Sequence, residues 1–417
     1  MSGAWHSKPL GEVATFINGL WKGEKPPYVN VGVIRNTNFA KDGSIDDSDV
    51  AFLDVEAKKF EKRKLQYGDI ILEKSGGGPK QPVGRVALFE KKDGDYSFSN
   101  FTSSIRVIDR NELDFHFLHR FLFWKYSSGL TEAMQSHSTG IRNLNADAYK
   151  QIAVPLPPLA EQQRIVAILD EAFAGLAIAT VNAEKNIKNT RELFESYLSS
   201  VFMKKRGEWK TSELGREVRF IDYRGKTPPK TETGIRLITA KNVKMNRIQR
   251  DPEEFINAGV YDGWMTRGYP KKGDVLFTTE APLGNVAQLD TDETVVIGQR
   301  LITMQPDEGG LDRTFLKYAL MSPPTQAEIH KRGTGATVVG IKASLLKQVP
   351  ISFPAQVADQ RALAVEMESA AENVARLEFI YRQKVSELAA TKQSILQKAF
   401  SGELTSPPSQ AIKEAAE

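Results

Sequence analysis

Polar loops whose side chains are suited to reading DNA are the most informative feature of this sequence. Lysine and arginine contact phosphates, arginine and lysine also bind guanine, and asparagine and glutamine bind adenine. In the first half of the chain the candidate DNA-binding residues are Arg35, Asn36, Lys74, Ser75, Lys80, Gln81, His137, Arg142 and Asn143. In the second half they are Lys241, Asn242, Thr278, Thr279, Arg300, Lys331 and Arg332. The loops match in place but differ in residue type, as two unlike half-sites would require.

Catalytic and metal-binding patterns are not suggested by the residue spacing. The chain has no cysteine and only five histidines, which excludes a thiolate zinc site and a cysteine nucleophile. Lys25-Pro26-Pro27-Tyr28 resembles the Asn/Asp-Pro-Pro-Tyr loop of amino-methyltransferases, but lysine cannot accept the hydrogen bonds that this loop needs. His116 and His119 are expected on a helix surface. We therefore expect no catalytic residue, bound cofactor or metal in this chain.

Composition is that of an ordinary globular protein, with 41% hydrophobic and 26% charged residues among 417. The formal net charge of +4 is weak evidence for nucleic acid, because clustering of charge matters more than its total. No run reaches the roughly eighteen apolar residues that a membrane span needs, and the N-terminus lacks a signal-peptide core. We expect a cytoplasmic protein without a membrane partner.

The sequence repeats itself once, which predicts two copies of one domain-sized unit. Landmarks recur in the same order at an offset of about 200 residues. They pair Trp5 with Trp209, Leu10-Gly11 with Leu214-Gly215, Gly68-Asp69 with Gly273-Asp274, Gly84 with Gly284, Phe117-Leu118 with Phe315-Leu316, and Lys150-Gln151 with Lys347-Gln348.

Each copy begins with short apolar runs and turns, which predict strands with one or two helices. Expected strands include Val29–Ile34, Asp69–Leu72 and Val83–Phe89, and expected helices include Leu113–Tyr126 and Arg313–Met321. A proline block then marks the start of a long helix in each copy, because proline is tolerated in a first helical turn.

Both long helices carry an apolar seam at three- and four-residue spacing, which is typical of a coiled coil. The first seam is Val166, Leu169, Phe173, Leu176, Thr180, Ala183, Ile187, Thr190, Phe194, Tyr197 and Val201. The second is Leu363, Met367, Ala370, Val374, Leu377, Tyr381, Lys384, Leu388, Thr391 and Ile395. The alternative is a pair of long helices that pack only on globular domains.

These observations predict an α+β fold with a pseudo-two-fold internal repeat. Two strand-rich globular domains of mixed α/β structure are separated by two long antiparallel coiled-coil helices. The expected ranges are 1–157 for the first domain, 158–205 for the first helix, 206–354 for the second domain, 355–404 for the second helix and 405–417 for a flexible tail.

The sequence resembles the specificity subunit of a Type I restriction–modification system. The resemblance rests on Trp5-x4-Leu10-Gly11, Gly68-Asp69-Ile70, the run Leu156-Pro157-Pro158-Leu159-Ala160-Glu161-Gln162-Gln163-Arg164-Ile165, Pro354-x5-Gln360-Arg361 and the ending Ile395 to Leu404. It covers residues 1–404, although the second copy lacks the second proline and the glutamate of the first copy's motif.

This resemblance implies two target recognition domains that bind a split, asymmetric sequence in double-stranded DNA. It also implies two modification subunits, which hold S-adenosylmethionine, and restriction subunits, which use ATP and Mg, as partners of a non-catalytic chain. Two alternatives stay open at this point. One is a stand-alone DNA-modifying enzyme, a methyltransferase with an unrecognised site, and the other is a coiled-coil scaffold with no DNA role.

Overall fold

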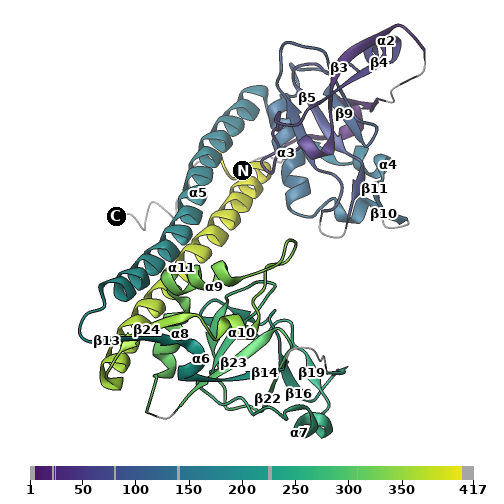
Figure 1. The fold of residues 1–417 in the computed structure, drawn as a ribbon. Coiled ribbons are helices and arrows are strands. Elements are labelled where there is room, and N and C mark those ends of the chain that lie inside the picture. Colours follow the sequence, from purple (N-terminus) through teal and green to yellow (C-terminus); the bar gives the residue numbers. More distant parts are fainter. Residues whose placement is uncertain are drawn as a thin grey trace, which may run out of the picture. The chain divides into compact units, whose positions relative to one another are not determined.

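The chain folds into two compact units, each with a globular head and parts of two long helices (Figure 1). The computed structural model describes residues 5–20, 23, 25–78, 81–138, 141–223, 228–307 and 309–405. Unit 1 is Met1–Asn182 with Lys384–Glu417, and unit 2 is Ala183–Gln383. The long helices are α5 (Leu159–Lys204) and α11 (Val357–Ser401). We call the part of each unit outside these helices its head.

The head of unit 1 is built on a four-stranded antiparallel sheet of order β2-β9-β5-β7. A second sheet has the order β4-β3-β8, with β8 parallel to β3, and a third has the order β10-β11-β6. Strand β1 pairs with β12, just before α5. The strands are β1 Ser7–Pro9, β2 Ala14–Asn18, β3 Tyr28–Ile34, β4 Ala51–Glu56, β5 Asp69–Glu73, β6 Ser75–Gly77, β7 Val86–Phe89, β8 Tyr96–Phe98, β9 Thr102–Val107, β10 Gln135–Ser138, β11 Ile141–Leu144 and β12 Ala153–Pro155.

Short helices cover this head. They are α1 Leu10–Val13, α2 Ala57–Glu61, α3 Phe115–Ser127 and α4 Ala146–Lys150, with the 3-10 turns Asn36–Asn38 and Glu132–Met134. Helix α3 begins after Asp114, whose carboxylate accepts a hydrogen bond from Phe117 N at 2.9 Å. Such an N-cap satisfies a backbone donor that has no partner within the helix. Its buried face includes Phe117, Leu118 and Phe121.

The head of unit 2 repeats this plan. Its four-stranded antiparallel sheet has the order β14-β23-β20-β21, and a second sheet, β15-β19-β16-β22, contains the parallel pair β16 and β22. Strand β13 pairs with β24, as β1 does with β12. The strands are β13 Trp209–Glu213, β14 Val218–Asp222, β15 Lys230–Thr231, β16 Ile235–Ile238, β17 Val243–Lys244, β18 Arg247–Ile248, β19 Phe255–Ile256, β20 Val275–Thr278, β21 Val286–Gln288, β22 Val295–Ile297, β23 Leu301–Pro306 and β24 Pro350–Pro354. The helices are α6 Leu214–Glu217, α7 Tyr261–Trp264, α8 Arg313–Met321, α9 Pro323–Arg332 and α10 Ala343–Leu346.

The two heads therefore share strand order, sheet direction and the parallel pair, which confirms the predicted fold class with its internal repeat. Helix α9 and the hairpin β17–β18 belong to unit 2, whereas unit 1 has the sheet β10-β11-β6. The shared frame explains why the sequence landmarks recur at strands, turns and helix starts. The differences fall in the segments between those landmarks.

Within each unit the start of one long helix packs against the end of the other, so the two helices run antiparallel there. In unit 1, Leu169 of α5 and Leu396 of α11 belong to one buried cluster, and the Phe400 ring lies 5.4 Å from that of Phe117. In unit 2, Leu198 of α5 packs in a cluster with Met367 of α11. The predicted seam is thus buried or half-buried where each helix meets its head.

A buried glutamine joins each head to the first turns of its long helix. In unit 1, Gln162 Oε1 accepts from Asp114 N at 2.8 Å, and its amide nitrogen donates to Glu112 O and Pro157 O, each at 2.8 Å. In unit 2, Gln360 Oε1 accepts from the corresponding backbone N of Asp312 at 2.7 Å. The second copy keeps this joint although it departs from the first copy's proline motif.

Helix α5 contains a stretch that is long and apolar enough to cross a membrane by length and composition alone. Its mean hydropathy is 1.6 over 18 residues, and 17% of that stretch is buried. In the structure this helix packs into unit 1 through Ile165 and Leu169, and its Asp170 forms an ion pair with Arg120 at 2.8 Å.

Candidate functional site

Strands β6, β11 and β10 bring together predicted DNA-binding residues from two distant loops of unit 1. Asn143 of β11 lies opposite Ser75 of β6, and Arg142 lies opposite Gly77. On its other side, β11 pairs with β10, where Arg142 faces His137. The His137 side chain and all of Lys80 lie outside the described residues. Long-range antiparallel pairing thus builds one polar surface from segments more than 60 residues apart.

A hollow of about 420 Å³ lies beside this sheet, and we call it hollow 1. It is lined by Phe16, Asn18, Leu72, Lys74, Ser75, Asn100, Ser103, Asn143, Leu144, Ala146, Tyr149 and Lys150. Lys74 Nζ donates to Asn18 Oδ1 at 2.8 Å, and Ser75 Oγ donates to Asn143 Oδ1 at 2.6 Å. Burial lowers the pKa of Lys74. These bonds hold a lysine and an amide in fixed positions, where they could bind base edges or phosphates.

Three other predicted residues of unit 1 are engaged next to this surface. Asn36 Nδ2 donates to Glu73 Oε1 at 3.0 Å, and Glu73 forms an ion pair with Arg85 at 2.7 Å. With its amide oxygen turned towards Arg85, Gln81 accepts from that guanidinium at 2.7 to 3.0 Å. Arg35 donates to the backbone and carboxylate of Asp49 at 2.8 and 3.0 Å. Their arrangement supports the loop, and none of the three lines hollow 1.

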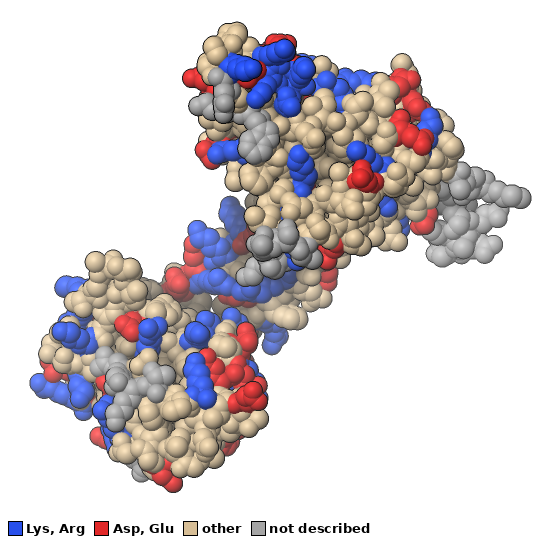
Figure 2. Space-filling view, turned by 90° about the vertical axis from the view of Figure 1, so that its right-hand side faces the viewer, with Lys and Arg blue, Asp and Glu red and all other residues tan. Residues whose placement is uncertain are grey.

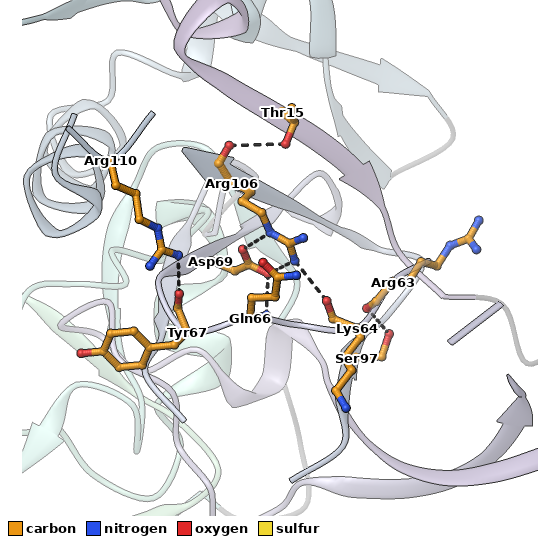
Figure 3. Close-up of polar contacts among 9 residues, drawn as sticks. All are labelled: Thr15, Arg63, Lys64, Gln66, Tyr67, Asp69, Ser97, Arg106 and Arg110. Carbon is orange, nitrogen blue, oxygen red and sulfur yellow. Dashed lines mark hydrogen bonds and ion pairs between the residues drawn. The ribbon is translucent and has the colours of Figure 1, made fainter. Parts of the chain in front are cut away.

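A buried ion pair links the neighbouring strands β5 and β9 of the unit 1 sheet (Figure 3). Asp69, at 0% exposure, accepts from Arg106 Nε at 2.7 Å and from Nη2 at 2.6 Å, and it also accepts from Gln66 N at 2.9 Å. Figure 3 shows Arg106 pointing at this carboxylate from the neighbouring strand β9. In unit 2 the corresponding Asp274 accepts from Gln305 at 2.6 Å. Burial raises the pKa of Asp274, which has no strong bidentate partner.

Unit 2 has a corresponding hollow of about 470 Å³, which we call hollow 2. It is lined by Thr279, Glu280, Gln299, Arg300, Thr334, Val338, Gly340, Ile341 and Lys342. Gly340 forms β-bridges with both Glu280 and Thr334, as Asn143 does with Ser75 and Ser136 in unit 1. The same three-segment pairing therefore frames both hollows.

Backbone hydrogen bonds fix the correspondence residue by residue. Leu144 N donates to Lys74 O at 2.9 Å, and Ile341 N donates to Thr279 O at 2.9 Å. The N–H groups of Lys74 and Thr279 in turn donate to the carbonyls of Phe101 and Arg300, both at 3.0 Å. The corresponding residues are Lys74 with Thr279, Ser75 with Glu280, Phe101 with Arg300, and Asn143 with Gly340.

Three predicted DNA-binding residues of unit 2 prove to be interior, which corrects their assignment. Asn242 is 1% exposed, and its amide bonds to the backbone of its own loop, including Thr239 N at 2.9 Å and Pro252 O at 2.9 Å. Thr278 and Thr279 are 0% and 2% exposed. Side chains without exposed surface cannot reach a base edge, so these three hold the loops in shape.

The other predicted residues of unit 2 are at the surface. Arg300 lines hollow 2 and forms an ion pair with Glu280 at 2.9 Å. Lys331 and Arg332 end helix α9, where both pair with Glu328. Lys241 is exposed next to the buried Asn242. Of the predicted set, only Thr279 and Arg300 line hollow 2, and Thr279 is 2% exposed.

The hollows are also lined by polar residues outside the predicted set, among them Asn18, Asn100, Glu280, Gln299 and Lys342. Glu280 does not fit a search for phosphate-binding side chains, because a carboxylate repels phosphates. Gln299 and Asn100 precede the corresponding residues Arg300 and Phe101, so alignment of the two copies could have found them. Figure 2 shows Lys and Arg in several separate groups with Asp and Glu among them, so charge alone does not mark the site.

Histidine and carboxylate groups do not form a metal site in the described part of the chain. Over the described ranges, no three His, Asp or Glu side chains cluster as such a site would require. His116 Nδ1 lies 3.9 Å from Glu90 at the surface. His119, which we expected on a helix surface, is only 2% exposed. Burial, with repulsion from Arg120, lowers its pKa to about 3, so the ring is neutral.

Comparisons with known proteins agree with this geometry. Residues 3–189 match the family model described as Type I restriction modification DNA specificity domain. The chain is 23% identical to the type I restriction enzyme EcoKI specificity subunit of Escherichia coli, over 96% of this chain and 89% of that protein. It is 26% identical to the type I restriction enzyme MjaVIII specificity subunit of Methanocaldococcus jannaschii, over 68% of this chain and 70% of that protein.

A solved structure extends the likeness of fold to the whole chain. The structure was solved to explain complex assembly and conformational transition of the type I R-M system. The similarity has a TM-score of 0.76 at 22% identity and covers 97% of this chain and 99% of the other. The first part of the chain thus matches the type I restriction–modification specificity domain, and nearly the whole chain is similar in sequence to a type I specificity subunit and in fold to a chain of a type I R-M system.

Proposed function

We propose that this chain recognises a two-part, asymmetric sequence in double-stranded DNA, and that each unit reads one half of it. The observation that carries the proposal is the pair of hollows with one backbone frame and different side chains. One backbone frame can carry different polar side chains to the bases, from positions that differ between the two units. Lysine, serine and asparagine in hollow 1 would then select other bases than arginine and glutamate in hollow 2.

The chain would act without catalysis of its own, as the DNA-reading member of a larger assembly. Its partners are two modification subunits and restriction subunits. S-adenosylmethionine, ATP and Mg belong to those partners, and this chain holds no cofactor. We place the assembly in the cytoplasm, without a membrane partner. The specificity-subunit relatives favour this function over that of a stand-alone methyltransferase.

The test uses the full chain in complex with its modification subunits, and it maps the methylated sequence. The combined substitution Lys74→Ala and Asn143→Ala should relax one half of the target by about 1–3 kcal/mol for each base that the variant no longer binds. The other half should keep its sequence. Lys91→Ala removes a lysine from a surface ion pair with Asp47 and is the matched control. Equal relaxation of both halves would contradict one reader per unit.

Binding to duplex DNA provides a second measurement. Affinity should fall as salt rises, because neutralised phosphates release counterions. A scaffold without a DNA role would show no such binding, and methyl transfer by the highly pure chain alone would favour the enzyme alternative.

A further inference from the structure

The ion pair between Arg300 and Glu280 is the most specific chemical feature of hollow 2. Arg300 Nε lies 2.9 Å from Glu280 Oε1, and the two side chains are 52% and 44% exposed. Both residues line the hollow, so the pair faces solvent at a concave surface. Among the described residues, the structure records no hydrogen bond from Arg300 Nη1 or Nη2 to protein. The two terminal nitrogens are thus available to a ligand.

The backbone holds this pair in place from both sides. Thr279 N donates to Arg300 O at 3.0 Å, which sets the residue before Glu280 next to Arg300. Across the bridge lies Gly340, where a Cβ atom would come within 3.1 Å of Glu280 Cβ and 3.4 Å of its Oε2. A larger residue at position 340 would therefore push the carboxylate aside. Glycine leaves the space that Glu280 occupies.

A carboxylate on a DNA-reading surface calls for a specific explanation. It accepts hydrogen bonds only, and both phosphates and base carbonyl groups would repel it. The amino group of cytosine N4 is the donor that glutamate matches in the major groove. Arginine matches the guanine N7 and O6 acceptors with two nitrogens, which is the number that Arg300 has free. Guanine and cytosine present these groups side by side in one base pair.

We propose that Arg300 and Glu280 together read one G·C base pair of the half-site bound by unit 2. Arg300 donates through Nη1 and Nη2 to guanine N7 and O6, and Glu280 accepts from cytosine N4. The inference rests on the proposed function and adds to it the residues and the base pair. The ion pair orients both side chains before DNA arrives, which lowers the entropic cost of ordering them on binding.

Unit 1 lacks this chemistry at the corresponding positions. Ser75 stands in place of Glu280, and Phe101, which is 45% exposed, stands in place of Arg300. A phenyl ring contacts the thymine methyl group and offers nothing to guanine acceptors. Reading of a G·C pair by an arginine–glutamate pair should therefore be confined to the half-site of unit 2, and Phe101→Ala should alter only the other half.

The experiment measures binding of the complex of this chain with its modification subunits to duplexes that carry its mapped target. Each guanine of the target is replaced in turn by 7-deazaguanine, which lacks the N7 acceptor. Each cytosine is replaced in turn by 2-pyrimidinone, which lacks the N4 amino group. One guanine and its paired cytosine should each weaken binding of the unchanged chain about tenfold.

Variants then connect that base pair to the two residues. Arg300→Ala should bind more weakly but lose its sensitivity to 7-deazaguanine at that guanine alone. Glu280→Gln should lose its sensitivity to 2-pyrimidinone at the paired cytosine. Arg250→Ala removes an arginine from an exposed ion pair with Glu293 in the same unit and should keep both sensitivities. Thermal unfolding of each variant confirms that the head is intact, and Arg300→Lys keeps the charge if Arg300→Ala unfolds.

Several results would overturn the inference. If Arg300→Ala weakens all duplexes equally and lowers the salt slope by about one, Arg300 contacts a phosphate. If the two variants relax two different base pairs, the residues do not read one pair. If the unchanged complex fails to prefer its target over a scrambled duplex, the proposed function itself fails. That last result is distinct because it appears before any variant is tested.

Discussion

Hollow 1 and hollow 2 share a backbone frame but differ in nearly every polar side chain that lines them. Hollow 1 offers Lys74 and Asn143, whereas hollow 2 offers Arg300 with Glu280. Equivalent hydrogen bonds hold both frames: Leu144 N donates to Lys74 O in unit 1, and Ile341 N donates to Thr279 O in unit 2. The comparison teaches that one backbone frame can present its polar side chains from different positions. Lys74 and Asn143 correspond to Thr279 and Gly340, whereas Arg300 and Glu280 correspond to Phe101 and Ser75.

The buried acids Asp69 and Asp274, which lie at the start of corresponding strands, also differ in their partners. Asp69 has a bidentate arginine, whereas Asp274 has the amide of Gln305 and the more distant guanidinium of Arg313 at 3.3 Å. Both carboxylates also accept a backbone N–H three residues before them, from Gln66 and Lys271. The corresponding buried carboxylates of the two units are thus held by different sets of partners. Substitutions at these partners test how far the two units are equivalent.

The largest difference between the units should come from Arg106→Ala. This change leaves the Asp69 carboxylate buried with only a backbone partner, which costs about 3–5 kcal/mol of unfolding free energy. Gln305→Ala should cost only about 1–2 kcal/mol, because a neutral donor is removed and Arg313 still pairs with Asp274. Urea unfolding of the two variants measures both values. Equal losses would mean that the two buried acids have equivalent partners.

A smaller, pH-dependent difference should arise at His119, whose place in unit 2 is taken by Lys317 paired with Glu368 at 2.8 Å. The pKa of His119 falls from 6.5 to about 3 on folding, so protons bind the unfolded chain more readily between these values. Its contribution to stability is complete above pH 6.5 and is lost as pH falls. The loss should reach about 2 kcal/mol by pH 5.

His119→Leu should remove this part of the pH dependence. The measurement is the difference in unfolding free energy between the variant and the unchanged chain at several values between pH 7 and pH 4. His116→Leu, at the surface of the same helix, is the control. A difference that stays constant with pH would mean that His119 titrates alike in the folded and unfolded chains.

The smallest effect should come from Tyr149→Phe. Tyr149 is fully buried at the edge of hollow 1, and its hydroxyl has no hydrogen-bond partner among the described residues. In unit 2 the corresponding residue is Leu346, which is also fully buried. Removing an unpaired buried hydroxyl should leave stability unchanged or raise it by up to about 1 kcal/mol. A loss of stability in thermal unfolding would show that the hydroxyl has a partner.

Much of the fold could be predicted from the sequence because its signals are local. The first long helix was expected at 158–205 from its seam and the proline block before it, and the structure has it as Leu159–Lys204. The strand expected at Asp69–Leu72 is β5, Asp69–Glu73. These elements follow from periodicity and from glycine or proline at their ends.

The candidate site was predicted only in part, because it depends on pairing between distant segments. Nothing local to Ser75 shows that Asn143 lies opposite it. Asn242 carries a side chain suited to adenine, but in this loop its amide replaces missing backbone partners, as asparagine often does in turns. The pairing of Glu280 with Arg300 could be recognised only once the structure placed the two side chains next to each other. The burial of His119 depends on the loop around Gly43, whose added Cβ would lie 2.9 Å from its Nε2.

The glutamine joints have a mechanical consequence. Gln162 and Gln360 tie the first turn of each long helix to the backbone at the start of α3 and α8, with no exposed surface or nearly none. The three hydrogen bonds of Gln162, each 2.8 Å long, oppose rotation of the start of α5 against its head. A partner that bound the start of α5 or α11 and rotated it would therefore rotate the adjoining head as well. Binding at either helix would then change the orientation of the surface that we propose to bind DNA.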